Sequence, residues 1–187
     1  MNISIIDFSG RNGQGNCWKI AKYIYNKLSF NNHISLIKYS NLNIKGCSKC
    51  NYSCLNPNVF KCDNPDETND VYLQVNQSDI AFYIIPIYSD YPCSNYFIFK
   101  ERSQATVDLH MKNYNKIKKC FIFIANTGEK NIKNVVVDEP GVNNVALILS
   151  TNEFNTKGFY GDLVEKSECL LKIDKYIKSC FENIEKI

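Results

Sequence analysis

Acidic residues are missing from a long stretch of this 187-residue chain, since no Asp or Glu lies between Asp7 and Asp63. The same stretch holds eight lysines and arginines, so it is locally basic, whereas the net charge of the whole chain is only +3. A net charge this small lacks the strong positive bias of nucleic-acid-binding domains. We therefore expect no nucleic-acid partner.

Long apolar runs and histidines are also scarce. No segment approaches the length of a membrane span, and the first residues predict a strand rather than a secretion signal. We therefore expect a cytoplasmic protein that does not bind membranes. His33 and His110 have no neighbouring carboxylates or cysteines, so neither is assigned a catalytic or metal-binding role.

Apolar residues make up 44% of the chain, which is enough to build the core of one domain over residues 1–187. Apolar runs predict strands at 3–8, 33–39, 79–85, 120–125 and 145–149. Helices are expected at 17–28, 71–78, 95–116 and 162–184, and residues 129–144 form a poor crossover helix. Lys112, Lys116, Lys118 and Lys119 indicate a solvated helix end. Alternating elements of this kind indicate an α/β fold, with a parallel sheet between two layers of helices.

A glycine-rich polar loop at residues 9–16 joins the first strand to the first helix. The first turn of a helix has N–H groups without partners and a partial positive charge, and both favour an oxyanion. The glycines Gly10, Gly13 and Gly15 permit close approach of the backbone, while Ser9 and Arg11 add donors. The loop therefore predicts a phosphate site.

The order of residues in this loop excludes two common nucleotide motifs. A P-loop has Lys-Ser/Thr after its last glycine, where this chain has Asn16-Cys17, and the glycines do not follow the dinucleotide pattern G-x-G-x-x-G. A dinucleotide site also has an acidic residue about 20 positions further on, which this chain lacks. A mononucleotide phosphate fits better. Ligands of parallel sheets bind at the carboxyl ends of the strands, where the loops 9–17, 86–95 and 126–129 are expected to meet.

Nine cysteines are present, and four of them gather in a loop at residues 47–65. The four are Cys47, Cys50, Cys54 and Cys62. Their spacing is compatible with an iron–sulfur cluster, with a tetrahedral zinc site or with free thiols, and the sequence does not decide among these three interpretations. The remaining cysteines are isolated, and we expect Cys120, Cys169 and Cys180 to be buried small hydrophobes. Cys93 lies in one of the loops expected at the site.

The motif Ser9-x-Arg11 followed by Gly15-Asn16, and Pro86-Ile87-Tyr88 after the third strand, resemble the flavodoxin-like NAD(P)H-dependent FMN reductase family. This resemblance implies a three-layer fold with a five-stranded parallel sheet in the order 2-1-3-4-5. It implies that the first loop binds the FMN phosphate through Ser9, Arg11, Gly13, Gly15, Asn16 and Cys17. This chain departs from the family motif at Phe8, Gly10 and Cys17.

The second family signature aligns without a gap onto residues 86–102. It implies that Pro86, Ile87, Tyr88 and Ser89 lie beside the flavin ring, and the loop after the fourth strand adds Asn126, Thr127 and Gly128 to the site. We expect Arg102 to form a structural ion pair rather than to bind a nicotinamide phosphate. The four cysteines resemble the motif that holds a [4Fe–4S] cluster in the iron–sulfur flavoprotein branch, although their third spacing is one residue longer.

These features predict an FMN-dependent oxidoreductase in which NAD(P)H reduces flavin N5 and the electrons pass to a quinone or another small acceptor. No side chain is then needed as a general acid or nucleophile. One alternative is an iron–sulfur flavoprotein electron carrier reduced by ferredoxin, and another is a zinc-stabilised binding protein without flavin. The resemblance further implies a homodimer or homotetramer.

Overall fold

The computed structural model describes residues 1–48, 50–56, 62–64, 66–103, 113–126 and 132–182. Its centre is a sheet with five parallel strands: β1 (Asn2–Asp7), β2 (His33–Lys38), β3 (Ile80–Tyr88), β5 (Lys118–Ala125) and β6 (Val145–Ser150). They are arranged β2-β1-β3-β5-β6, so the predicted order 2-1-3-4-5 of the long strands is confirmed. The two-residue strand β4 (Tyr91–Pro92) pairs antiparallel with β3 and was not predicted.

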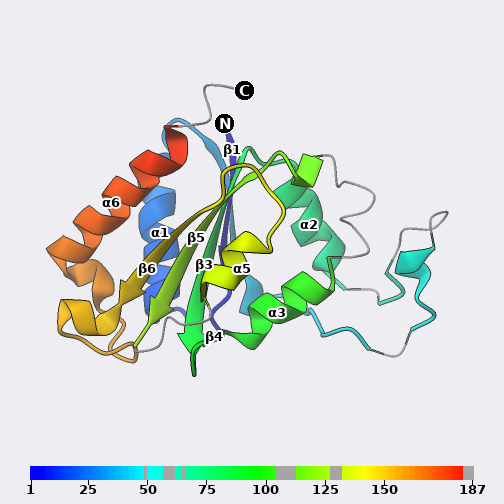
Figure 1. The fold of residues 1–187 in the computed structure, drawn as a ribbon, viewed down its shortest axis with the longest axis horizontal. Coiled ribbons are helices and arrows are strands. Elements are labelled where there is room, and N and C mark those ends of the chain that lie inside the picture. The colour runs from blue at the N-terminus through cyan, green and yellow to red at the C-terminus, as the bar shows by residue number, and fades with distance from the viewer. Residues whose placement is uncertain (49, 57–61, 65, 104–112, 127–131, 183–187) are drawn as a thin grey trace.

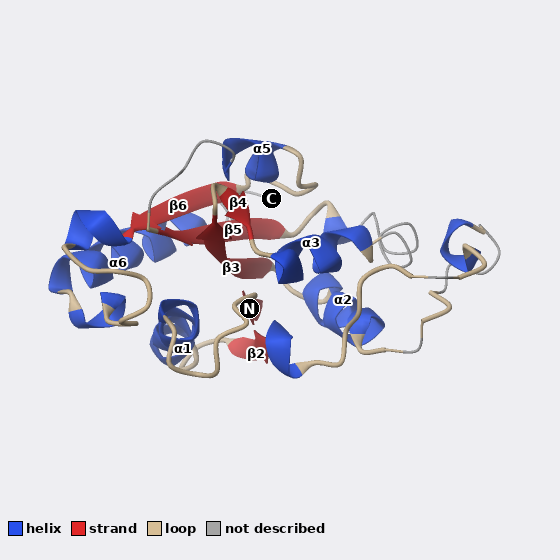
Figure 2. Ribbon diagram, turned by 90° about the horizontal axis from the view of Figure 1, so that it is seen from below, coloured by secondary structure: helices blue, strands red, loops and turns tan. Residues whose placement is uncertain are grey.

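Helices cover both faces of the sheet, as Figures 1 and 2 show. One face carries α1 (Asn16–Leu28) and α6 (Ser167–Phe181), and the other carries α2 (Thr68–Asn76), α3 (Ser94–Glu101) and α5 (Ile132–Val137). Short 3₁₀ turns lie at Tyr39–Asn41, Ser53–Leu55, Thr151–Phe154 and Leu163–Glu165. The predicted three-layer α/β fold is confirmed. Among the described helices, none is long and apolar enough to cross a membrane.

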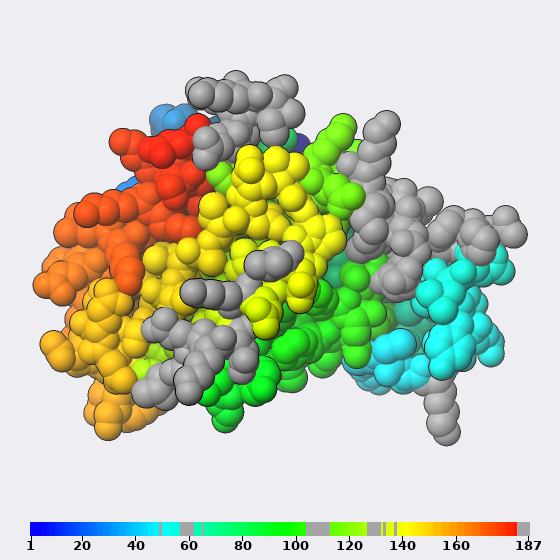
Figure 3. All heavy atoms as spheres, viewed as in Figure 1, coloured from blue at the N-terminus to red at the C-terminus, as the bar shows by residue number. Residues whose placement is uncertain are grey.

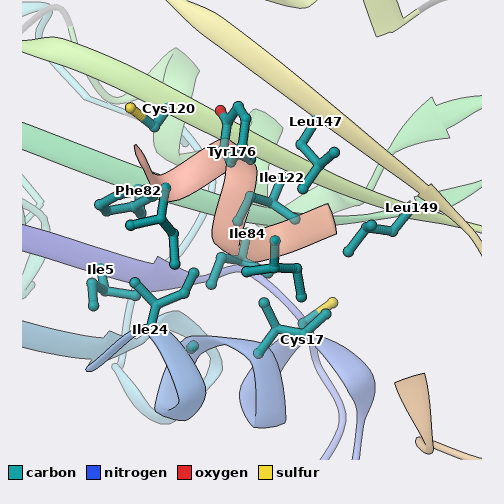
Figure 4. Packing of buried hydrophobic residues seen from close by; sticks show 14 of the residues in the cluster. Ile5, Cys17, Ile24, Phe82, Ile84, Cys120, Ile122, Leu147, Leu149 and Tyr176 are labelled. Atoms are coloured by element: carbon teal, nitrogen blue, oxygen red, sulfur yellow. The ribbon is translucent and has the colours of Figure 1, made fainter. Parts of the chain in front are cut away.

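The core beneath α1 and α6 is aliphatic. Figure 4 shows Ile5, Ile84 and Ile122 of the sheet packed against residues of these helices, with Cys17 at one end of the cluster. The hydroxyl of Tyr176 on α6 donates to the carbonyls of Phe121 and Val145, both at 2.9 Å, and so joins the helix to two neighbouring strands. Cys120, Cys169 and Cys180 are fully buried here, as predicted.

The core on the other face is aromatic. Phe8 lies at its centre, with the rings of Tyr39, Tyr83, Tyr96 and Phe99 at centroid distances of 5.3 to 5.8 Å. Because side chains alternate between the faces of a strand, central strands that are covered on both sides read as continuous apolar runs. Strand β5 shows this pattern from Cys120 onward, and all eight of its residues are buried.

Strand β3 is longer than the sequence indicated. We expected it to end before Pro86, but it continues through Ile87 to Tyr88 and then turns back into β4. Proline lacks the N–H that a sheet ladder needs. At Pro86, however, β3 has already passed the end of β1, because Asp7 lies opposite Ile84. The strand therefore tolerates the proline, and the predicted loop at 86–95 is largely a hairpin.

The assignment of Lys118 and Lys119 to a solvated helix end was wrong. Both belong to β5 and are buried. Lys119 Nζ donates to the carbonyl of Tyr114 at 3.0 Å and to that of Pro140, and it lies 3.7 Å from the centre of the Tyr114 ring. Burial lowers the pKa of Lys119 to about 8. The ammonium group of Lys119 therefore contacts carbonyl groups and an aromatic ring, whereas we expected it to be exposed to solvent.

The remaining helices begin or end near the expected positions. Helix α1 begins one residue earlier than predicted, α2 covers most of the predicted 71–78, and α6 is preceded by a 3₁₀ turn within the predicted 162–184. Helix α3 occupies the first part of the predicted 95–116, of which residues 104–112 lie outside the described part of the chain. Of the crossover at 129–144, the described residues 132–144 contain one helix, the six-residue α5.

Candidate functional site

A cavity of about 280 Å³ opens where the carboxyl ends of β1, β3 and β5 meet. Its lining includes nine of the predicted site residues: Ser9, Arg11, Gly15, Asn16, Cys17, Pro86, Ile87, Tyr88 and Asn126. The three loops that were expected to meet at this edge of the sheet therefore contribute to one cavity, at the position where ligands of parallel sheets bind.

Two of the predicted site residues that the structure describes are not part of this lining. Gly13 lies in the first loop with a positive φ of 69°, and Ser89 lies at the tip of the hairpin. Thr127 and Gly128 lie outside the described residues. The sequence analysis missed Ile124, Ala125, Gly158 and Phe159. The last two could have been found, since they follow β6, whose carboxyl end lies at the same edge of the sheet.

The start of α1 has features that favour an anion. Helix α1 has no side-chain hydrogen bond at its N-cap, Gly15, and no acidic residue in its first turn. Asn16 is the first residue of the helix, and its Oδ1 accepts a hydrogen bond from the N–H of Leu163 at 3.0 Å rather than from an N–H of the first turn. Ser9 Oγ is buried, belongs to a residue that lines the cavity, and has no hydrogen-bond partner among the described residues. A buried hydroxyl without a partner is costly, and a phosphate oxygen in the cavity would satisfy it.

A segment after β6, residues 156–161, closes over the first loop. Arg11 donates from Nη1 to the carbonyl of Gly158 at 3.2 Å and from Nη2 to that of Phe159 at 2.5 Å. Lys19 Nζ donates to the carbonyl of Gly161 at 2.6 Å. Arg11 was predicted as a charge for the phosphate. Here its guanidinium lines the cavity and also holds this segment in place.

The hairpin after β3 forms another wall of the cavity. Ser89 and Asp90 have positive φ angles of 48° and 68°, which are typical of the two-residue turns that join twisted antiparallel strands. Tyr88 precedes this turn and is 60% exposed, while Phe159 across the cavity is 59% exposed. Two aromatic rings therefore lie at the mouth of the cavity, and they offer apolar faces to a planar ligand.

The thiols near the cavity are poor nucleophiles. Burial raises the pKa of Cys17 well above its usual value, and the carboxylate of Asp7 raises it further. Burial also raises the pKa of Cys93 to about 11, and its Sγ donates to the carbonyl of Phe8 at 3.3 Å. Of the described residues that line the cavity, Arg11 alone is charged. The cavity can hold a ligand, but the reactive group must come with that ligand.

The four-cysteine segment lies away from this cavity, at the edge of the molecule beyond α3 (Figure 1). Cys47 is exposed, and Cys50, Cys54 and Cys62 are half-buried. Within the part of the chain that the structure describes, no group of three or more His, Cys, Asp or Glu side chains could hold a metal ion. Arg102 forms an ion pair with Asp66, whose oxygen lies 2.7 Å from Nη1, so its predicted structural pairing is confirmed.

Similar folds occur among solved structures. The structure of Smu.1420 from Streptococcus mutans aligns with a TM-score of 0.64 and 13% identity, over 93% of this chain and 100% of that one. FerB from Paracoccus denitrificans, described as a flavoenzyme NAD(P)H:(acceptor) oxidoreductase, aligns with a TM-score of 0.60 and 15% identity over 98% and 97%. A putative quinone reductase from Klebsiella pneumoniae aligns with a TM-score of 0.64 and 9% identity over 97% and 85%.

The chain has the flavodoxin-like fold. No protein-family model matches the sequence, and no curated protein is significantly similar to it. The likeness therefore concerns the arrangement of strands and helices in this flavodoxin-like domain. The function must be argued from the cavity itself.

Proposed function

We propose that this flavodoxin-like protein binds FMN and acts as an oxidoreductase that takes electrons from NAD(P)H and passes them to a quinone or another small acceptor. The observation that carries the proposal is Ser9 Oγ, a buried hydroxyl that lacks a partner among the described residues, together with the uncapped first turn of α1 at the same cavity. FerB, a flavoenzyme NAD(P)H:(acceptor) oxidoreductase, and the putative quinone reductase from Klebsiella pneumoniae are described with activities of the same kind.

The first loop and α1 would hold the phosphate of FMN. Ser9 Oγ and the N–H groups of the first turn donate hydrogen bonds, and the dipole of the 13-residue helix favours the negative charge. Pro86, Ile87 and Tyr88 line the wall from which backbone groups would meet the flavin ring. When bound, FMN would supply hydride acceptance at N5 and stepwise electron transfer, chemistry that no side chain of the cavity offers.

The size of the cavity indicates where an electron acceptor would meet the bound cofactor. At about 280 Å³ it lies near the lower limit for small-molecule sites. A bound cofactor would therefore extend to the mouth, where Tyr88 and Phe159 are exposed. These rings would shield one edge of the flavin from water and present flat apolar surfaces to a planar acceptor.

The test compares FMN with riboflavin, which lacks only the phosphate. We expect FMN to bind the purified protein and riboflavin to bind about 100-fold more weakly, since the phosphate contacts are charge-assisted. NADH or NADPH oxidation should then depend on added FMN and on an acceptor such as a soluble quinone. Equal binding of the two flavins would contradict the phosphate site, and no flavin binding would overturn the proposed function.

The two alternative functions predict a different cofactor content in the same purified protein. An iron–sulfur carrier reduced by ferredoxin requires iron and acid-labile sulfide in protein purified without oxygen, and a zinc-stabilised binding protein requires zinc without flavin. No group of three or more of the described cysteines is positioned to hold a metal ion. We therefore rank both alternative functions below the FMN reductase. The homodimer or homotetramer and the choice between NADH and NADPH stay predictions.

A further inference from the structure

The segment 156–161 is held against the cavity through both backbone groups of Gly158. Figure 3 shows this part of the chain, coloured orange, at the surface of the molecule next to α6. The N–H of Gly158 donates to Asn126 Oδ1 at 2.7 Å, and its carbonyl accepts from Arg11 Nη1 at 3.2 Å and from Asn16 Nδ2 at 3.3 Å. Three residues that line the cavity therefore fix one glycine of the segment.

The side chain of Asn126 is itself fixed. Its Oδ1 also accepts a hydrogen bond from Thr151 Oγ1 at 2.8 Å, and Thr151 is fully buried. Asn126 directly follows β5 and Thr151 directly follows β6, so these hydrogen bonds join the ends of two neighbouring strands to the segment. A Cβ atom at Gly158 would lie only 2.8 Å from Asn126 Oδ1, and this close fit therefore depends on a glycine at position 158.

Phe159 comes next in the chain, and its position depends on the same contacts. Its carbonyl accepts from Arg11 Nη2 at 2.5 Å, so the backbone is held at Phe159 as well as at Gly158. Phe159 lines the cavity and is 59% exposed, and its ring centre lies 4.3 Å from that of Tyr160. An exposed aromatic ring on a fixed backbone is a preorganised surface for a flat ligand, because little freedom is lost on binding.

We propose that Asn126 is a positioning residue: through Gly158 it holds the Phe159 ring at the mouth of the cavity, and this ring makes the site selective for flat aromatic acceptors. The acceptor class rests on the proposed function, whereas the hold on Gly158 exists without a bound cofactor. The sequence analysis placed Asn126 beside the flavin. In this proposal its Oδ1 serves the protein, because the N–H of Gly158 and the hydroxyl of Thr151 both donate to that atom.

Thr151 separates this proposal from a direct contact between Asn126 and a ligand. Thr151 does not line the cavity, so its hydroxyl can affect a ligand only through the orientation of Asn126. Thr151→Val removes that hydroxyl. Thr68→Val is the matched control, since Thr68 is a buried threonine of α2 that does not line the cavity either. Asn126→Asp keeps an oxygen that can accept both hydrogen bonds, whereas Asn126→Ala removes it.

The first experiment measures amide hydrogen exchange of the full-length protein without flavin, in fragments that cover residues 156–161. Asn126→Ala should speed this exchange about fivefold, because the N–H of Gly158 loses its acceptor. Thr151→Val should change the exchange in the same direction by a smaller factor. Asn126→Asp and Thr68→Val should exchange like the wild type. This measurement requires neither FMN nor activity.

The second experiment measures turnover of the FMN-loaded protein with saturating NADH or NADPH, at FMN concentrations that saturate each variant. The acceptors are menadione, a flat two-ring quinone, and ferricyanide, a compact octahedral anion. Asn126→Ala and Phe159→Ala should each raise KM for menadione about fivefold with little change in kcat, and should leave KM for ferricyanide unchanged. The double variant should be no worse than Phe159→Ala, since Asn126 acts through that ring.

Unchanged exchange in Asn126→Ala or in Thr151→Val would overturn the hold on Gly158. Equal losses with menadione and ferricyanide, or additive losses in the double variant, would overturn the selectivity through Phe159. Failure of the wild type to bind FMN is a different result. It would overturn the proposed function together with the acceptor class, while the exchange measurement would still decide whether Asn126 holds Gly158.

Discussion

Asp7 and Lys38 form a buried ion pair beneath the first loop, with Lys38 Nζ 2.9 Å from Asp7 Oδ2. They face each other at the ends of β1 and β2. Asp7 Oδ1 also accepts the N–H of Ser9 at 2.8 Å, and Lys38 Nζ lies 3.4 Å from the carbonyl oxygen of Ser9. The pair therefore fixes the backbone of Ser9 on both sides, which leaves its hydroxyl free for a ligand.

Lys38→Met should lower the free energy of unfolding by roughly 3 kcal/mol, because it leaves the Asp7 carboxylate buried without its partner. The double variant Asp7→Asn/Lys38→Met should be more stable than Lys38→Met alone, since no buried charge then remains. Urea unfolding of both variants measures the difference. If the second substitution adds a further loss instead, the two side chains do not act as a pair.

Ser9→Ala should weaken FMN binding about tenfold while leaving the protein without FMN at least as stable as the wild type. The hydroxyl has no partner among the described residues, so its removal costs no known protein hydrogen bond but removes one to the phosphate. Titration of FMN and thermal unfolding without FMN measure the two effects. The matched control is Ser4→Ala, because Ser4 Oγ lies 2.7 Å from Ser78 Oγ, away from the cavity. That variant should lose stability and keep its FMN affinity.

Gly161→Ala should destabilise the protein by about 2 kcal/mol or more. Gly161 has a φ of 70°, and a Cβ atom at this position would collide with the carbonyl oxygen of Gln14 in the first loop. Gly10→Ala is the control, since a Cβ there meets nothing within 4 Å. Chemical unfolding should separate the two variants clearly. Equal stabilities would show that the contact between the segment 156–161 and the first loop does not contribute to the free energy of unfolding.

The contribution of Lys119 to the free energy of unfolding should increase as the pH rises from 8 to 10. Its pKa in the folded protein, about 8, lies below that of an exposed lysine, so the unfolded chain binds the proton more tightly. The penalty for burying the charge is complete below pH 8 and is relieved above it, by roughly 2 kcal/mol up to pH 10. Burial also raises the pKa of Cys17, Cys93 and Tyr114, so ionisation of these groups on unfolding lowers stability as the pH rises, and the contribution of Lys119 must be measured as a difference between the wild type and a lysine variant.

The measurement for Lys119 is the free energy of unfolding in urea across this pH range. The free energy of unfolding of the wild type minus that of Lys119→Met should grow by roughly 2 kcal/mol from pH 8 to 10. The same difference for Lys22→Met, at an exposed position of α1, should not change with pH. A difference for Lys119→Met that also stays constant would contradict the lowered pKa of Lys119.

The sequence predicted the parts of the fold that depend on local patterns. The continuous apolar runs of β3 and β5 and the glycine-rich loop before α1 are local signals, and they placed most of the cavity correctly. The hairpin at Ser89 was missed because a proline in a strand is tolerated only where a neighbouring strand has ended, which is a tertiary fact. Lys119 was missed for the same reason, since its partners, the carbonyls of Tyr114 and Pro140, meet it only in the folded chain.

The roles of some site residues likewise depend on tertiary contacts that the sequence alone does not reveal. Ser9 and Asn16 could be found from the loop that contains them, but the role of Asp7 and Lys38 depends on the pairing of β1 with β2. Gly158 and Phe159 have no motif of their own, and their place after β6, at the edge of the sheet where the cavity lies, was the signal that could have indicated them.

The contacts from Arg11 to Gly158 and Phe159 join positions that are 147 and 148 residues apart. Synthesis proceeds from the N-terminus, so the first loop leaves the ribosome long before the segment that closes over it. Until that segment has emerged, the first loop lacks its cover and Arg11 lacks both carbonyl partners. Capture of a ligand at this loop therefore marks the end of folding rather than its beginning.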